Sequence, residues 1–251
     1  MQIFIYLYIF FIALCLGSFL NVCIYRIPKG ESIAYPPSHC GSCGKHLKAL
    51  DLIPVFSYIF LKGRCRYCSE KISIRYPIIE LITGVLITAV YIQYGLNYMF
   101  FKYSVLILFL IVIAMIDFDT TDVYFKTTLS GIITGIVFLV YGYFVGQGIF
   151  TYFWGALLGG GLITLIILIT RGMGWGDMEI ALMCGLFLGL KLTVFMLFTS
   201  FVLGGFIASI LILLKIKSRK DYIPFGPFIA LGAMAAILFG EKIIEWYLLM
   251  F

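Results

Sequence analysis

The stretch Ile111-Val112-Ile113-Ala114-Met115-Ile116-Asp117-Phe118-Asp119 ends a long apolar run with a carboxylate. A second carboxylate, Asp177, follows Gly172-Met173-Gly174-Trp175-Gly176, where another apolar run begins. A carboxylate at bilayer depth costs roughly 2.5–3.5 kcal/mol on insertion scales, so it is rare unless it is paired, solvated or functional. Two carboxylates that meet can share one proton and activate a water molecule between them. The sequence therefore predicts acid–base chemistry at a membrane surface.

The composition excludes an ordinary soluble domain. Hydrophobic residues make up 63% of the chain, against about 45–50% in typical globular domains, and the mean hydropathy is +1.09. No segment shows the period-two alternation of a barrel strand. We therefore predict an all-α polytopic membrane protein. The first apolar segment lacks a preceding basic region and a following small-residue cleavage site, so we expect a retained span.

About 20 apolar residues are needed to cross a bilayer. Eight segments fit this length, and they cover residues 3–24, 76–96, 101–117, 127–146, 150–170, 178–195, 196–215 and 225–250. The sixth and seventh are separated only by Lys191 and a few glycines, so a count of seven stays open.

The basic residues orient these spans. With the N-terminus outside, the cytoplasmic segments are 25–75, 118–126, 171–177 and 216–224. Fifteen of the 18 lysines and arginines fall on that side, as the positive-inside rule requires. The excess of basic residues, which gives the net charge of +6, then faces anionic lipid. It therefore implies no nucleic-acid partner. The same orientation places Asp117, Asp119 and Asp177 on the cytoplasmic side.

The segment 25–75 contains two C-x2-C pairs, Cys40-Gly41-Ser42-Cys43 and Cys65-Arg66-Tyr67-Cys68, separated by 21 residues. Paired knuckles of this kind are typical of tetrahedral Zn²⁺. Two disulfides or free thiols are the alternative, and a cytosolic location disfavours disulfides. Four thiolates leave no open position for substrate, so we expect a structural site whose metal supplies folding energy to the loop.

Each aspartate also has a simpler interpretation. Asp177 could cap a helix after an ordinary glycine-rich turn, and Asp117 could belong to a polar loop outside the third span. The glycines before Asp177 are expected to allow close backbone approach and unusual φ angles. Near the first span, Gly17, Ser18 and Asn21 are expected to pack helices together, and Glu80 is expected to reach the membrane interface.

Taken together, these motifs resemble the type IV prepilin peptidases. The resemblance covers almost the whole chain, in the order Leu16-Gly17-Ser18-Phe19-Leu20-Asn21-Val22, Arg26-Ile27-Pro28, both C-x2-C pairs, Leu52-Ile53-Pro54-Val55, Arg75-Tyr76-Pro77 with Glu80, Ile116-Asp117-Phe118-Asp119, Gly172-Met173-Gly174-Trp175-Gly176-Asp177 and Pro224-Phe225-Gly226-Pro227. The Gly-x-Gly-Asp element is shared with other intramembrane aspartyl proteases, but the cysteine loop and the Gly-Ser-Phe-Leu-Asn opening are not.

The resemblance implies an endopeptidase that removes the short basic leader of prepilins and pseudopilins after a glycine, at the cytoplasmic face. It assigns catalysis to Asp117 and Asp177, with Asp119 as the substitute for Asp117 and with Gly174 and Gly176 in support. It also implies N-methylation of the new N-terminus with S-adenosylmethionine. The expected partners are prepilins with apolar N-terminal helices and the lipid bilayer, in a prokaryotic cytoplasmic (inner) membrane.

The expected division of the chain is a first transmembrane helix at 1–24, a cytoplasmic zinc-binding domain at 25–75 and a transmembrane aspartyl protease domain at 76–251. The chain departs from the family at two places. Tyr124-Phe125 stand where a proline-aspartate pair is usual, and Glu179 stands where a lysine is usual. Two other functions stay open, an intramembrane aspartyl protease of other single-span substrates and a proton- or cation-coupled carrier.

Overall fold

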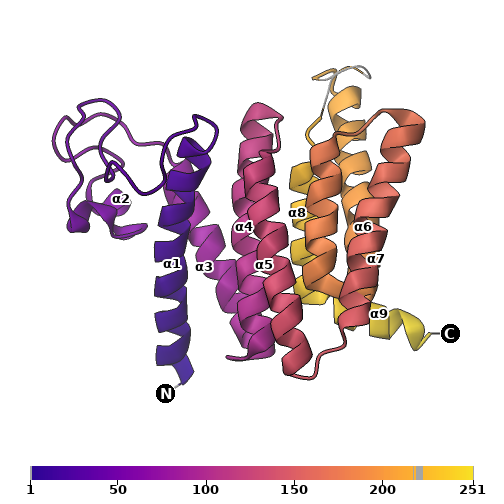
Figure 1. The fold of residues 1–251 in the computed structure, drawn as a ribbon. Helices are drawn as coiled ribbons and strands as arrows, with labels where there is room; N and C mark the ends of the chain where they lie inside the picture. Colours follow the sequence, from indigo (N-terminus) through magenta and orange to yellow (C-terminus); the bar gives the residue numbers. More distant parts are fainter. Residues whose placement is uncertain (1, 217, 219–222, 251) are drawn as a thin grey trace. The chain divides into compact units, whose positions relative to one another are not determined.

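The computed structural model describes residues 2–216, 218 and 223–250, and within these residues all regular elements are helices. The chain divides into two compact units, Met1–Gly95 and Leu96–Phe251, which we describe separately. Figure 1 shows the helices of each unit. The all-helical architecture predicted from composition is confirmed for the described residues.

The first unit consists of two long helices, α1 (Gln2–Arg26) and α3 (Arg75–Tyr94), with a loop region between them that holds only η1 (Ala49–Leu52) and α2 (Phe56–Phe60). Glycines bring α1 and α3 together. A Cβ on Gly17 would lie 2.8 Å from the Cα of Glu80. Close approach of small residues of this kind is how apolar helices associate in membranes.

The polar residues at this helix pair are buried and partnered. Asn21 donates through Nδ2 to the carbonyl of Tyr76 at 3.1 Å, which ties α1 to the start of α3. Glu80 is only 7% exposed, and its Oε2 accepts the backbone N–H of Val55 at 2.7 Å. The expectation that Glu80 reaches the interface was therefore wrong. Its carboxylate instead holds Val55, whose φ of 62° is uncommon for a β-branched residue, in place at the start of α2.

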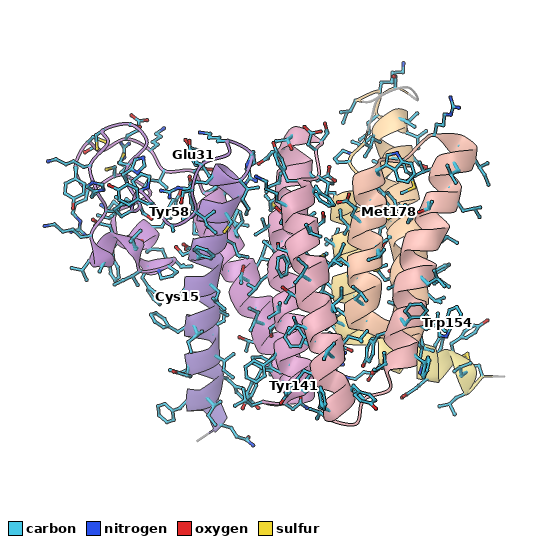
Figure 2. All side chains as sticks on the ribbon, in the orientation of Figure 1. Cys15, Glu31, Tyr58, Tyr141, Trp154 and Met178 are labelled. Atoms are coloured by element: carbon cyan, nitrogen blue, oxygen red, sulfur yellow. The ribbon has the colours of Figure 1, made fainter. Side chains whose placement is uncertain are left out.

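The second unit is a bundle of helices (Figure 1). Its helices are α4 (Tyr98–Thr120), α5 (Phe125–Phe144), α6 (Ile149–Thr170), α7 (Trp175–Leu213), α8 (Gly226–Ala235), η2 (Ala236–Gly240) and α9 (Glu241–Leu248). The apolar centre includes Leu106, Ile107 and Leu110 of α4, which are fully buried. Apolar side chains such as Trp154, 51% exposed, point outward at the periphery of the bundle (Figure 2).

Helix α7 is a hairpin of two arms. At Gly189 the backbone leaves the helical region, with φ 77° and ψ 170°, a conformation that glycine adopts without steric cost. Ile180 and Gly204 both lie beside the first residues of α8, whereas Leu192 lies beside Gly240 at the end of η2. The chain therefore reverses at Gly189, and both ends of α7 lie at the same end of the bundle.

Seven helical segments of the described residues are long and apolar enough to cross a membrane, with Gly226–Leu248 as one continuous segment. One of the seven is the hairpin α7, which contains the two spans predicted at 178–195 and 196–215. The boundary predicted between those two spans was wrong by several residues. The turn occurs at Gly189, where Tyr152 of α6 leaves no more space than a glycine needs.

Candidate active site

Asp117 lies in the last turn of α4 and is 1% exposed. Its Oδ2 accepts the backbone N–H of Gly226, at the start of α8, at 3.0 Å. Its carbonyl accepts the N–H of Thr121, whose left-handed conformation ends the helix. The first helical turn of α8 thus supplies the donor that the buried carboxylate needs.

Asp177 lies in the first turn of α7 and is 2% exposed. Its Oδ2 accepts the N–H of Gly174, the N-cap residue, at 3.1 Å. A negative charge is stabilised in the first turn of a helix by the unpaired N–H groups there. Gly174 has φ −83°, and the glycines at 172, 174 and 176 all avoid the left-handed region, so the expectation of unusual φ angles was wrong.

Close backbone approach is what the glycines of this segment provide. A Cβ on Gly176 would lie 2.4 Å from the Cβ of Val123, which follows α4. Only a glycine lets the first turn of α7 contact the α4–α5 loop at this distance. The start of α7 and the end of α4 are thereby held against each other, as expected for Gly176.

The two aspartates converge on the start of α8. Gly226 contacts Asp117, and a Cβ on it would also lie 3.1 Å from the Cδ1 of Ile180. Ile180 is one turn beyond Asp177 and shares its helix face. Two buried acidic groups from distant parts of the chain therefore lie at one end of the bundle.

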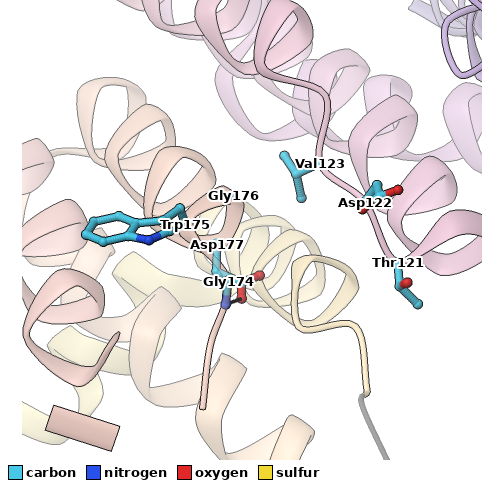
Figure 3. Close-up of a pocket in the computed structure, with 7 residues that line it drawn as sticks. All are labelled: Thr121, Asp122, Val123, Gly174, Trp175, Gly176 and Asp177. Atoms are coloured by element: carbon cyan, nitrogen blue, oxygen red, sulfur yellow. Dashed lines mark hydrogen bonds between the residues drawn. The ribbon is translucent and has the colours of Figure 1, made fainter. Parts of the chain in front are cut away.

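An open pocket of about 230 Å³ lies beside Asp177. Figure 3 shows its two walls, which are Thr121, Asp122 and Val123 after α4, and Gly174 to Asp177 at the start of α7. The pocket therefore places one of the two buried carboxylates in the lining of an open cavity. Asp117 is not among the lining residues. Its contact near the site is the hydrogen bond from the backbone N–H of Gly226.

Gly226 is the site residue whose role the sequence did not reveal. Pro224-Phe225-Gly226-Pro227 predicts only a rigid helix start. A Cβ at position 226 would lie 2.5 Å from the Oδ2 of Asp117, so no other residue fits without moving the carboxylate. The available signal is a glycine followed by proline at a helix start, but its partner lies 109 residues away.

The remaining acidic residues near the site differ from the pair. Asp119 is exposed, because two residues advance a helix by about 200° and turn the side chain away from the face of Asp117. Glu179 hydrogen-bonds through Oε2 with the hydroxyl of the fully buried Thr128. The unusual glutamate at 179 therefore joins α7 to α5.

The four cysteines of the loop gather at one point. The Sγ atoms of Cys40, Cys43, Cys65 and Cys68 lie within 4.8 Å of one another, and those of Cys40 and Cys68 are 3.8 Å apart. A tetrahedral Zn–S distance of about 2.3 Å implies sulfurs about 3.8 Å apart. The described residues thus place four thiols with the spacing that a metal ion such as zinc requires.

The two knuckles share one backbone geometry. Gly44 donates its N–H to the carbonyl of Cys40 at 2.8 Å, and Ser69 donates to Cys65 at 3.0 Å. Both donors are left-handed, with φ 69° for Gly44 and 59° for Ser69. Each knuckle is therefore a tight turn that directs its two thiols to the same side. The left-handed serine was not evident from sequence.

The electrostatics of the cluster also fit a bound cation. Backbone N–H groups of Cys43 and Ser42 lower the pKa of the Cys40 thiol to about 6. For Cys68 the N–H of Glu70 favours the thiolate, but desolvation and the neighbouring thiols raise the pKa to about 12. Four crowded thiols cannot all ionise unaided, and a divalent cation removes that obstacle.

Asp51 connects η1 to the second knuckle. Its side chain is 3% exposed and accepts from Arg66 Nε at 2.6 Å. Its other oxygen accepts the hydroxyl of Tyr67 and the N–H of Lys48. Desolvation opposes ionisation, but Arg66 and Lys48 together lower the pKa of Asp51 below its ordinary value. This carboxylate is therefore committed to holding the loop.

Two family profiles match the chain. The profile of the bacterial peptidase A24 N-terminal domain matches residues 11–94, and that of the type IV leader peptidase family matches residues 104–209. No solved structure matches the chain.

Curated relatives match over nearly their full length. The prepilin leader peptidase/N-methyltransferase of Aeromonas hydrophila is 32% identical over 96% of this chain and 92% of its own. The protein of the same name from Bacillus subtilis (strain 168) is 32% identical over 96% of this chain and 97% of its own. That of Neisseria gonorrhoeae is 30% identical, covering 94% and 92%. With this coverage and the two buried aspartates in place, the chain belongs to the type IV leader peptidase family.

Proposed function

We propose that this protein is a membrane-embedded aspartyl endopeptidase that removes the leader of type IV prepilins and pseudopilins after a glycine, at the cytoplasmic face. The observation that carries the proposal is the pair Asp117 and Asp177, both buried and each held by one backbone N–H. The relatives in this family are named prepilin leader peptidase/N-methyltransferase, and a pair of buried carboxylates fits the hydrolysis that this name describes. Membership of the type IV leader peptidase family does not favour the two alternative functions, which are a protease of other single-span substrates and a proton- or cation-coupled carrier.

In this mechanism the two carboxylates divide the roles of acid and base. One is protonated and polarises the scissile carbonyl, and the other takes a proton from a water molecule that attacks the same carbon. No covalent intermediate forms. Mutual repulsion between two nearby carboxylates favours the singly protonated pair. Asp117 and Asp177 are assigned these roles together, and Gly174, Gly176 and Gly226 hold them in position.

The relatives' names also include N-methyltransferase. We propose that this chain methylates the N-terminus exposed by cleavage, with S-adenosylmethionine as methyl donor. The support is full-length similarity that includes the N-terminal domain. The donor supplies the methyl group, and the protein's part is to present an uncharged amine to it.

The test uses purified full-length protein, a prepilin substrate in detergent and S-adenosylmethionine. Wild-type protein is expected to cut after the glycine, and mass spectrometry is expected to show the mature N-terminus heavier by one methyl group. A glycine-to-alanine change at the cleavage site is the matched control and should stop cleavage. If the altered substrate is cut as fast as the original, the prepilin assignment fails.

We propose further that Cys40, Cys43, Cys65 and Cys68 bind structural Zn²⁺. Cys43→Ser is expected to lower bound zinc from about one ion per chain to near zero, because it removes one of the four thiolate ligands. It is also expected to unfold the loop, because the free energy of zinc binding is the folding free energy of such small domains. Elemental analysis and limited proteolysis within residues 27–74 measure both effects. Cys15→Ser is the control, since Cys15 is an exposed residue of α1 (Figure 2). Unchanged zinc content in Cys43→Ser would disprove the site.

The chain is a multi-pass protein of the inner membrane, and its seven candidate spanning segments and its relatives support that location. We propose that the N-terminus lies outside, that 1–24 and 76–251 are membrane segments, and that 25–75 is cytoplasmic. In the second unit Asp117, Asp177 and Gly226 lie at one end of the bundle. This arrangement supports the orientation proposed from the distribution of lysines and arginines, in which both aspartates lie on the inner side.

A further inference from the structure

The pocket beside Asp177 contains a second acidic residue to which the proposed chemistry gives no role. Among the described residues that line the pocket, Asp122 and Asp177 are the charged ones, and both are carboxylates. The Asp177 side chain is committed to Gly174 and to catalysis. The Asp122 side chain is exposed, and among the described residues its carboxylate accepts no hydrogen bond and forms no ion pair.

Asp122 is fixed in position although it is exposed. The hydroxyl of Thr120 accepts its N–H at 3.2 Å, and Thr120 itself belongs to the last turn of α4. The next residue, Val123, packs against Gly176 of α7. Backbone contacts on both sides therefore hold Asp122 at one rim of the pocket, and Figure 3 shows it on the wall facing Gly174 and Asp177.

The charges of the residues that line the pocket determine which ligand it favours. The Asp122 carboxylate has no partner among the described residues and lies in the same pocket lining as Asp177, so the pocket attracts a positive charge and repels a negative one. Two other acidic residues, one in each unit, already have partners. Asp51 is bound to Arg66, and Glu179 is bound to Thr128. Asp122 is the one that borders the pocket containing a proposed catalytic group.

We propose that Asp122 forms a subsite for a cationic side chain, lysine or arginine, of the substrate segment that lies across the pocket during cleavage. The inference rests on the proposed peptidase function and adds to it the residue that selects the charge of the leader. Asp122 acts by attracting the substrate and takes no part in proton transfer, so its loss affects KM more than kcat.

The experiment is a charge exchange between enzyme and substrate. The experiment compares the wild-type protein with Asp122→Asn and Asp122→Lys. Each protein is given three prepilins, which differ at the basic leader residue nearest the scissile bond. That residue is lysine in the first prepilin, glutamine in the second and glutamate in the third. An exposed ion pair contributes up to about 1 kcal/mol, or about fivefold. With the lysine leader, kcat/KM is expected to fall about fivefold in Asp122→Asn and about tenfold or more in Asp122→Lys. These losses are expected mostly in KM and are expected to shrink as salt is added.

The decisive result is rescue. Asp122→Lys is expected to cleave the glutamate leader better than the lysine leader, the reverse of the wild-type preference. Glu31→Lys is the matched control, because Glu31 is exposed and belongs to the first unit (Figure 2), and it should keep the wild-type order.

Equal losses on all three leaders in Asp122→Lys would overturn the subsite, as would an unchanged order of preference. Circular dichroism and retained cleavage of the glutamine leader show that the variants are folded. If wild-type protein cuts none of the leaders, the peptidase proposal itself fails, and that outcome is distinct from loss of the subsite alone.

Discussion

Asp117→Asn and Asp177→Asn are each expected to lower prepilin cleavage by about 10²- to 10⁴-fold, the contribution that a positioned acid or base makes to a rate. Asparagine keeps the shape of the side chain and can keep one hydrogen bond, so Gly226 and Gly174 retain their partners. It cannot accept the proton that the mechanism requires. Single-turnover cleavage in detergent measures the effect, and circular dichroism checks that helix content is kept.

Two comparisons make this result specific. Glu31→Gln removes an exposed carboxylate of the first unit and should leave the rate unchanged. Asp119→Asn tests the substitute aspartate, and we expect a small effect because Asp119 is exposed and turned away from the face of Asp117. If Asp119→Asn abolishes cleavage while Asp117→Asn does not, the two assignments are exchanged. If both Asp117→Asn and Asp177→Asn still cut normally, the dyad is wrong.

Gly226→Ala is expected to lower kcat by about 100-fold with little change in KM. The added Cβ would lie 2.5 Å from the Oδ2 of Asp117, so the carboxylate must shift and loses the geometry of its N–H donor. A displacement of about 1 Å in a catalytic group costs roughly this factor. Steady-state cleavage of a prepilin separates kcat from KM, and thermal unfolding reports any change in fold.

Gly205→Ala is the matched control, since a Cβ on this α7 glycine meets no neighbouring atom within 4 Å. It should cleave at the wild-type rate and unfold at or slightly above the wild-type temperature, because alanine favours a helix over glycine by about 1 kcal/mol. Full activity in Gly226→Ala would show that the contact with Asp117 has no part in catalysis.

Much of this arrangement follows from local sequence. Apolar length predicts the helices, and two interruptions of apolar runs by aspartate identify Asp117 and Asp177. The spacing of Cys40, Cys43, Cys65 and Cys68 predicts a metal cluster because both knuckles are local turns. Each of these features depends on residues that are neighbours in the chain, and the sequence displays such neighbours directly.

Other features depend on contacts between distant segments. The partner of Asp117 is a backbone N–H of Gly226, and a backbone group leaves no mark in the sequence. Glu80 is a polar residue within an apolar helix, and its partner, the backbone N–H of Val55, lies 25 residues earlier in the chain. Gly189 is one of several glycines in an apolar run, and its backbone φ of 77°, which the sequence does not display, distinguishes it from the others.

The hairpin of α7 has a consequence for the lipid around it. Its first arm runs from Trp175 to the break at Gly189 and so has 14 helical residues. At 1.5 Å per residue this arm is about 21 Å long, whereas the hydrocarbon layer is about 30 Å thick. A segment this short is accommodated by local thinning of the bilayer. We therefore expect the bilayer to be thinner beside this arm, which would bring water closer to Asp177.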